Sequence, residues 1–218
     1  MPEIKLFNKP IESQDSGGSP KIKLFGRWDT AGISVNEKGL QGYINLRPQI
    51  VPRSHGRSAK KQFHKSHMNI VERLANHLFV PGHRGKKNLF TTGKETGKTE
   101  TVFKIIREAF ERIEEKTKKN PVEVLVRAIE NSALREEITS FQVGGIMARK
   151  AVIASPQRRV DLALRLITQA AYQKKHNGHK KMAQTLADEI AAAYNNDGQN
   201  SVAIKEKERI EREAAGAR

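Results

Sequence analysis

The fold of this chain is decided by residues 120–159, which read NPVEVLVRAIENSALREEITSFQVGGIMARKAVIASPQRR. Asn120 and Pro121 suit the cap and the first position of a helix, and Glu123 lies where a capping box places its acid. Apolar residues then recur at helical spacing as far as about Ala133. The stretch therefore opens with a helix whose inward-facing residues are Val124, Leu125, Ala128 and Ile129.

A β-hairpin is predicted directly after this helix, because the period of the apolar pattern changes there. Residues 138–143 and 146–153 are rich in β-forming side chains and flank Gly144 and Gly145. Two glycines between such runs are typical of a two-residue hairpin turn, since both turn positions need a positive φ. We therefore expect a hairpin near residues 136–154.

Helices are predicted on both sides of the hairpin. Ser155 and Pro156 repeat the cap pattern and begin a helix that runs to about Lys175. On the N-terminal side, Ser66 is placed to cap a helix that runs to about Phe79. Further helical patterns cover residues 100–118, 180–194 and 201–213. The sequence thus predicts a mostly α fold, a helical bundle of about six helices with one protruding β-hairpin and an extended basic N-terminal segment.

Composition divides the chain into four regions. The first is rich in Gly, Ser and Pro, and the last is charged and offers little apolar face for packing. The regions are a flexible N-terminal arm at 1–20, an extended basic segment at 21–65, a helical core with the hairpin at 66–200, and a charged C-terminal tail at 201–218.

Positive charge is concentrated in two segments of the chain. The net charge is +16, and such an excess indicates a polyanionic partner. Residues 53–87 hold nine Lys or Arg against one acid, and residues 141–181 also hold nine against one. The remaining 22 basic and 22 acidic residues cancel. The pattern therefore predicts a neutral scaffold that presents two basic surfaces to a nucleic acid.

Several functional classes are disfavoured by composition. The chain has no cysteine, so it has no disulfide, no cysteine zinc site and no thiol nucleophile. No apolar run approaches the roughly 20 residues that span a bilayer. The start, Met-Pro-Glu-Ile-Lys, lacks the pattern of a signal peptide. We therefore expect a cytoplasmic protein with no membrane partner.

The candidate RNA ligands are the side chains of the two basic segments. Dense cations beside glycine and small residues suit close contact with phosphates, and Phe63 is placed to stack or to pack. Basic residues at a helix start oppose the macrodipole, so Arg158 and Arg159 are expected to serve a ligand. The low aromatic content, 6%, favours recognition of folded RNA by shape and backbone. The candidates are Arg53, His55, Arg57, Lys60, Lys61, Lys65, Arg84, Lys86, Lys87, Arg149, Lys150, Arg158, Arg159, Arg165, Lys174, Lys175, Lys180 and Lys181.

One motif offers an alternative function as a nucleotide-binding enzyme. Residues 93–99, GKETGKT, resemble a phosphate-binding loop, but three residues instead of four separate Gly93 from Gly97. We interpret the motif as a flexible loop that leads into a helix.

Two histidine pairs lack the glutamate and the third ligand of a zincin site; they are His64 with His67 and His176 with His179. No metal, cofactor or catalytic residue is predicted, and an enzyme is not expected.

Several motifs, in order along the chain, resemble the universal small-subunit ribosomal protein seven family in its archaeal or eukaryotic form. The resemblance covers roughly residues 20–218. It is carried by KIKLFGRW at 21–28, HGRSAKK at 55–61, IVERL at 70–74, GKK at 85–87, NPVEVLVRAIENS at 120–132, the glycines at 144–145, SPQRR at 155–159 and AIKEKERIER at 203–212.

The resemblance implies a structural protein of the small ribosomal subunit in the cytoplasm. It implies binding to the 3′ major (head) domain of small-subunit rRNA early in head assembly. It also implies that the hairpin lies near exit-site tRNA and the mRNA exit path, and that proteins of the head and platform are neighbours. A free DNA-binding helical protein is the remaining alternative, and duplex DNA in competition with rRNA separates the two.

Overall fold

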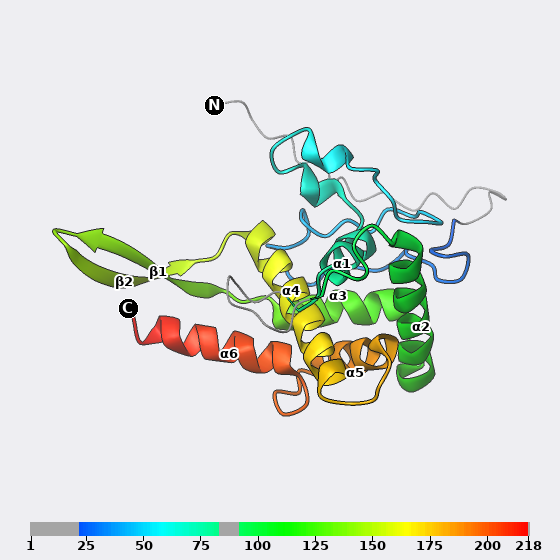
Figure 1. Cartoon of the computed structure of the whole chain (residues 1–218). Coiled ribbons are helices and arrows are strands. Elements are labelled where there is room, and N and C mark those ends of the chain that lie inside the picture. The colour runs from blue at the N-terminus through cyan, green and yellow to red at the C-terminus, as the bar shows by residue number, and fades with distance from the viewer. Residues whose placement is uncertain (1–21, 83–91, 218) are drawn as a thin grey trace.

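The computed structural model describes residues 22–82 and 92–217 of the chain. In these residues it contains six α-helices and one two-stranded antiparallel sheet. The helices are α1 (Ile70–Leu78), α2 (Thr99–Thr117), α3 (Pro121–Ser132), α4 (Pro156–His176), α5 (Met182–Tyr194) and α6 (Val202–Ala215). The remaining elements are strands β1 (Glu136–Val143) and β2 (Ile146–Ile153) and the short 3₁₀ helices η1 (Arg57–Ala59) and η2 (His64–His67). The predicted helical bundle with one protruding hairpin is confirmed (Figure 1).

Helix α5 is the central element of the bundle, since it packs against α2, α3 and α4. Leu186, Ala187 and Ile190 on this helix are completely buried. Small residues such as Ala187 let neighbouring helices approach closely, because the interaxial distance depends on the side chains at the contact. Within the part of the chain that the structure describes, no helix is long and apolar enough to cross a membrane.

The N-terminal segment contributes to the core although it has little regular structure. Leu24 and Leu40 are completely buried. The ring of Trp28 packs edge-on against Phe110 of α2, with the ring centroids 5.5 Å apart. The indole N–H of Trp28 also donates a 2.9 Å hydrogen bond to Glu114. An extended segment is therefore fixed to α2 by an aromatic anchor whose polar atom has a partner.

The predicted helix starts differ in how well they match the structure. Asn120 accepts a 3.1 Å hydrogen bond from the backbone N–H of Val122, as its capping position predicts. Ser155 occupies the N-cap position of α4, but its side chain makes no capping hydrogen bond. The prediction that Ser66 caps α1 is wrong, because α1 begins at Ile70 and Asn69 is its cap.

The hairpin is fully paired from base to tip. The register joins Glu136 to Ile153 at the base and Val143 to Ile146 at the turn. Gly144 has φ 55° and Gly145 has φ 90°, as a two-residue turn of this hand requires.

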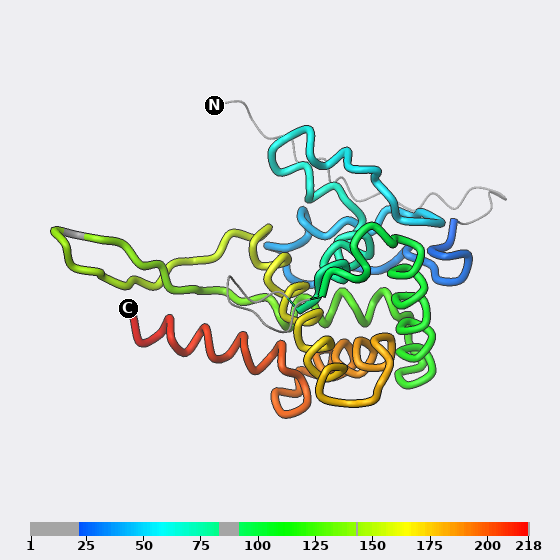
Figure 2. The backbone as a smooth tube through the Cα atoms, in the orientation of Figure 1, coloured from blue at the N-terminus to red at the C-terminus, as the bar shows by residue number. Residues whose placement is uncertain are grey.

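Helix α6 lies along the hairpin, where it contacts β1 and β2 (Figure 2). The charged C-terminal tail was predicted to have little apolar surface for packing, and this is confirmed only for the middle of α6. Ala203, Ile204 and Ala214 are buried near its two ends. The backbone N–H of Arg135 donates a 2.8 Å hydrogen bond to Glu211 of α6, so the base of the hairpin is tied to the C-terminal helix.

Candidate nucleic-acid interface

The basic loop, residues 53–65, is held by the body at both ends. At its start, the carboxylate of Glu72 on α1 accepts hydrogen bonds from the backbone N–H and the hydroxyl of Ser54, at 2.7 and 2.6 Å. At its end, the ammonium of Lys65 lies 2.7 Å from Asp161 on α4. The loop is therefore positioned by two carboxylates while most of its cations stay exposed.

Asp161 also forms an ion pair with a second cation, which is buried. Arg73 of α1 has a side chain with no exposed surface, and it donates 2.8 Å hydrogen bonds to Asp161 and to the carbonyl of Tyr43. Burial alone raises the pKa of Asp161, but hydrogen bonds from Lys65 and Arg73 outweigh it and hold the pKa below its ordinary value. The carboxylate thus stays ionised and joins α1, α4 and the basic loop.

In the sequence these two carboxylates are only the lone acids of their cationic segments, and no role was predicted for either. Glu72 is the one acid among residues 53–87, and Asp161 is the one acid among residues 141–181. A lone carboxylate in a cationic segment was the signal available in the sequence. The structure shows that both position the basic loop.

A groove separates the basic loop from the start of α4. Its volume is about 290 Å³, and its lining residues are Phe63, Ser155, Gln157, Arg158, Asp161, Leu162 and Arg165. Figure 1 shows the loop above the first turns of α4. The two predicted basic segments therefore meet here. We call this the loop–α4 surface and define it by Arg57, Lys60, Lys61, Phe63, Arg158 and Arg165.

Most of the predicted RNA ligands are exposed and have no ion pair within the described part of the chain. They are Arg53, His55, Arg57, Lys60, Lys61, Arg149, Lys150, Arg165, Lys175 and Lys181. Arg158 is also exposed, but its guanidinium lies 2.6 Å from Glu137 at the hairpin base. An exposed pair of this kind contributes little free energy, so a phosphate is able to replace the carboxylate.

Arg159 requires a correction. It was expected to face a ligand from the start of α4, but only 10% of its side chain is exposed. Its guanidinium donates to the carbonyl of Leu134 at 2.8 Å and to Glu37 at 2.5 Å. Arg159 ties the N-terminal segment and the hairpin base to α4, and we leave it out of the interface.

The second basic segment does not form one surface, which corrects the expectation of two patches. Lys174 lies sixteen residues after Arg158 on the same helix, and this separates them by about 24 Å along the helix axis. Lys174 is paired with the buried Glu189 at 2.6 Å, and Lys180 with Asp188 at 3.5 Å. The cations at the end of α4 are thus far from the loop–α4 surface and partly neutralised.

The hairpin carries cations of its own on a different part of the molecule. Arg149 and Lys150 are exposed on β2 and pair across the ladder with Ser140 and Thr139. Gly144 and Gly145 form the turn beyond them. Three further predicted ligands, Arg84, Lys86 and Lys87, lie outside the described residues.

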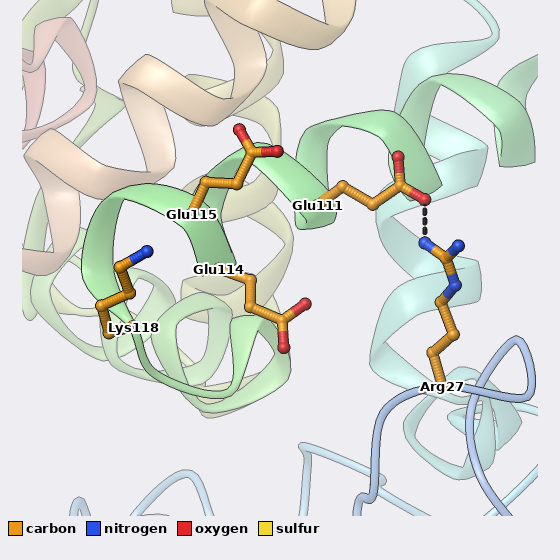
Figure 3. Close-up of a pocket in the computed structure, with 5 residues that line it drawn as sticks. All are labelled: Arg27, Glu111, Glu114, Glu115 and Lys118. Carbon is orange, nitrogen blue, oxygen red and sulfur yellow. Dashed lines mark hydrogen bonds and ion pairs between the residues drawn. The ribbon is translucent and has the colours of Figure 1, made fainter.

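A second hollow, beside α2, has the opposite character. Figure 3 shows Arg27 of the N-terminal segment reaching toward Glu111, with which it forms an ion pair. Glu114, Glu115 and Lys118 complete the lining. Three carboxylates against two cations repel a polyanion, so this face is no candidate for RNA.

The residues of the alternative nucleotide site form a turn before α2. The backbone N–H of Thr96 donates to the carbonyl of Gly93 at 3.0 Å, Gly97 has φ 80°, and α2 begins at Thr99.

The rings of His64 and His67 lie with centroids 5.2 Å apart. Across residues 22–82 and 92–217, no group of three or more His, Cys, Asp or Glu side chains is placed to hold a metal ion.

Comparison with known proteins identifies the family. Residues 40–218 match the family described as Ribosomal protein S7p/S5e. The chain belongs to this family. The S7p/S5e match covers the basic loop, the bundle, the hairpin and α6, and it confirms the resemblance that the sequence motifs carry.

Relatives in the S7p/S5e family are similar over nearly the whole chain. The "Small ribosomal subunit protein uS7" of Nanoarchaeum equitans is 48% identical over 201 residues, which is 91% of this chain and 100% of the relative. The protein of the same name from Methanococcus vannielii is 44% identical over 93% of this chain and 98% of the relative. That from Archaeoglobus fulgidus is 43% identical over 91% and 96%. By name, these relatives are proteins of the small ribosomal subunit.

Proposed function

We propose that the chain is a structural component of the small ribosomal subunit in the cytoplasm, where it binds rRNA. The names of its archaeal relatives support its assignment to the small ribosomal subunit. The observation that supports this binding site is the loop–α4 surface, where Phe63 of the basic loop and Arg158 and Arg165 of α4 line one groove. The loop that contains Phe63 also exposes Arg57, Lys60 and Lys61. Cations held on two rigid elements contact phosphates without losing much conformational freedom, and this suits a folded RNA junction.

We further propose that the RNA is the 3′ major domain of small-subunit rRNA, and that binding there starts assembly of the subunit head. The anchoring of the basic loop supports a scaffolding role. Glu72 and Asp161 hold both ends of the loop, which limits how far its backbone moves relative to α4. A rigid set of phosphate ligands fixes the angle between RNA helices that converge on it.

The hairpin is the element that we assign to exit-site tRNA and the mRNA exit path. It projects from the body (Figure 1), and the residues that follow its turn are apolar. Ile146 is 75% exposed and Met147 is 63% exposed, while Arg149 and Lys150 supply charge behind them. An arm with an apolar tip and a cationic stem is suited to contact RNA through van der Waals contacts with bases and through phosphate contacts together. The remaining surfaces are then free for neighbouring proteins of the head and platform.

A competition experiment tests the proposed function. The full chain is bound to a labelled transcript of the 3′ major rRNA domain, and unlabelled transcript or duplex DNA of equal phosphate number is added. We expect the transcript to compete at a concentration at least ten-fold lower than the DNA. Equal competition, or preference for the duplex, contradicts rRNA binding and favours the free DNA-binding alternative. The same chain titrated with ATP and Mg²⁺ tests residues 93–99, and tight binding would favour the enzyme alternative.

A further inference from the structure

The side chain of Phe63 is presented to solvent at the edge of the groove. It is 68% exposed, which is unusual for a large aromatic residue. Its backbone has φ 60°, in the left-handed region that bulky residues rarely adopt. The left-handed backbone belongs to the turn that begins η2. The fold does not bury the ring, so its exposure points to contact with a ligand.

The surroundings of Phe63 favour a nucleic acid over a protein as the ligand. Of the seven residues that line the groove, only Phe63 and Leu162 are apolar. Arg158 and Arg165 lie on its α4 side, and the exposed cations Lys60 and Lys61 precede Phe63 in the loop. A single aromatic ring among cations suits a base with its flanking phosphates, because the ring stacks on the base while the cations bind the backbone.

The backbone of Phe63 is held by the residues that follow it. The carbonyl of Phe63 accepts a 3.2 Å hydrogen bond from the backbone N–H of Ser66 within η2. Lys65, two residues after Phe63, forms an ion pair with Asp161 at 2.7 Å. The short turn and the ion pair therefore hold the loop backbone at Phe63 near α4, and little ordering of this backbone is needed when a base binds.

We propose that Phe63 is a stacking platform for one unpaired nucleobase, which lies in the groove while Lys60, Lys61 and Arg165 hold the adjacent phosphates. This inference rests on the proposed function and deepens it, because it names an extruded or bulged nucleotide as part of the RNA ligand. Recognition then includes a contact that a continuous duplex does not offer.

Binding of the 3′ major-domain transcript by the full chain tests the proposal. Phe63→Ala is expected to weaken binding roughly ten-fold, as loss of one base stack does. The salt dependence of binding should stay unchanged, because stacking releases no counterions. Phe63→Trp is expected to bind as the parent does, with quenching of its fluorescence by RNA. Trp28, the chain's one tryptophan, is buried and provides the background signal in the parent.

Phe63→Gly separates binding from folding. Glycine adopts φ 60° without steric cost, so the midpoint of urea unfolding should be equal or higher while RNA binding falls as for Phe63→Ala. The stacking proposal is overturned if Phe63→Ala binds RNA as tightly as the parent does, or if RNA does not quench the fluorescence of Phe63→Trp. Either result would favour a protein as the partner of the Phe63 ring. If the parent chain itself fails to bind the transcript, the proposed function fails instead.

Discussion

The guanidinium of Arg73 on α1 donates a 2.8 Å hydrogen bond to the carboxylate of Asp161 on α4, and the Arg73 side chain has no exposed surface. The same carboxylate lies 2.7 Å from the ammonium of Lys65 at the end of the basic loop. One acidic residue therefore compensates a buried cation of the core and positions the cationic loop above it. The stability of the bundle and the geometry of the loop–α4 surface are linked through this residue.

Asp161→Asn is expected to lower the free energy of unfolding by about 2–4 kcal/mol, because it leaves the buried Arg73 without its counter-charge. Urea denaturation measures the effect. Lys65→Ala, which removes the more exposed partner of the same carboxylate, should cost no more than about 1 kcal/mol. Similar losses in the two variants would show that the buried pair is not the stabilising one.

Stability should fall in mildly acidic solution because of His77 on α1. Burial is the largest cause that lowers the pKa of His77 from 6.5 to about 4, and the nearby Lys65, Arg165 and Arg73 lower it further, while Asp161 opposes them. Between these two pH values the unfolded chain binds a proton on His77 that the folded chain does not, so the free energy of unfolding decreases as the pH falls. The loss is at most about 3.4 kcal/mol.

Urea unfolding of the parent and of His77→Gln at pH 7, 5.5 and 4.5 checks this dependence. The variant should lose less stability than the parent across the series. Asp161 has a pKa below its ordinary value of 3.8, so its own contribution is lost only at lower pH. Parallel profiles for the two proteins would rule out His77 as the source of the acid sensitivity.

Glu189 on α5 is expected to stabilise the packing of α6 against the bundle. Its buried carboxylate accepts hydrogen bonds from the hydroxyl of Ser201 at 2.8 Å, the backbone N–H of Ala203 at 3.0 Å and the ammonium of Lys174 at 2.6 Å. Glu189→Gln removes the negative charge from these donors and should cost about 2–4 kcal/mol. The matched control is the adjacent Asp188→Asn, whose partially exposed pairs predict a loss below about 1 kcal/mol. Urea midpoints compare the two.

The hairpin turn provides a local test. Gly145 has φ 90°, and a Cβ placed there has nothing within 4 Å, so Gly145→Ala strains the backbone without a clash. The expected cost is about 1–2 kcal/mol, confined to the hairpin because it projects from the bundle. Hydrogen exchange of β1 and β2 amides should become faster while α5 amides stay protected. Gly42→Ala, which has an equally open site and no positive φ, should leave exchange unchanged.

The elements set by local sequence were predictable, and those set by distant partners were not. Asn120 caps α3 as its own pattern indicates, and the glycine pair forms the turn. The start of α1 depends on a distant segment instead. The N–H of Ile70 donates to the carbonyl of Asn45, and the amide of Asn69 donates to the carbonyl of Arg47. No periodicity in residues 66–79 reveals those contacts.

The same limit applies to the candidate site. Arg159 and Arg165 look alike in the sequence, but the partner of Arg159 is Glu37, 122 residues away, whereas Arg165 lines the groove. Lys174 is likewise paired with Glu189 of α5, a different helix. Charge counting located the basic segments correctly, and only the tertiary structure distinguishes the cations that are used internally.

The salt dependence of binding to the 3′ major-domain transcript tests the central claim most directly. In the variant Arg57→Ala, Lys60→Ala, Lys61→Ala, the slope of log affinity against log salt should become shallower by about one for each phosphate that the variant no longer binds. The control Lys94→Ala, Lys98→Ala, Lys104→Ala removes the same charge from exposed residues elsewhere and should keep the parent slope. Equal slopes for the loop variant and the parent would contradict the assignment of the loop–α4 surface to RNA.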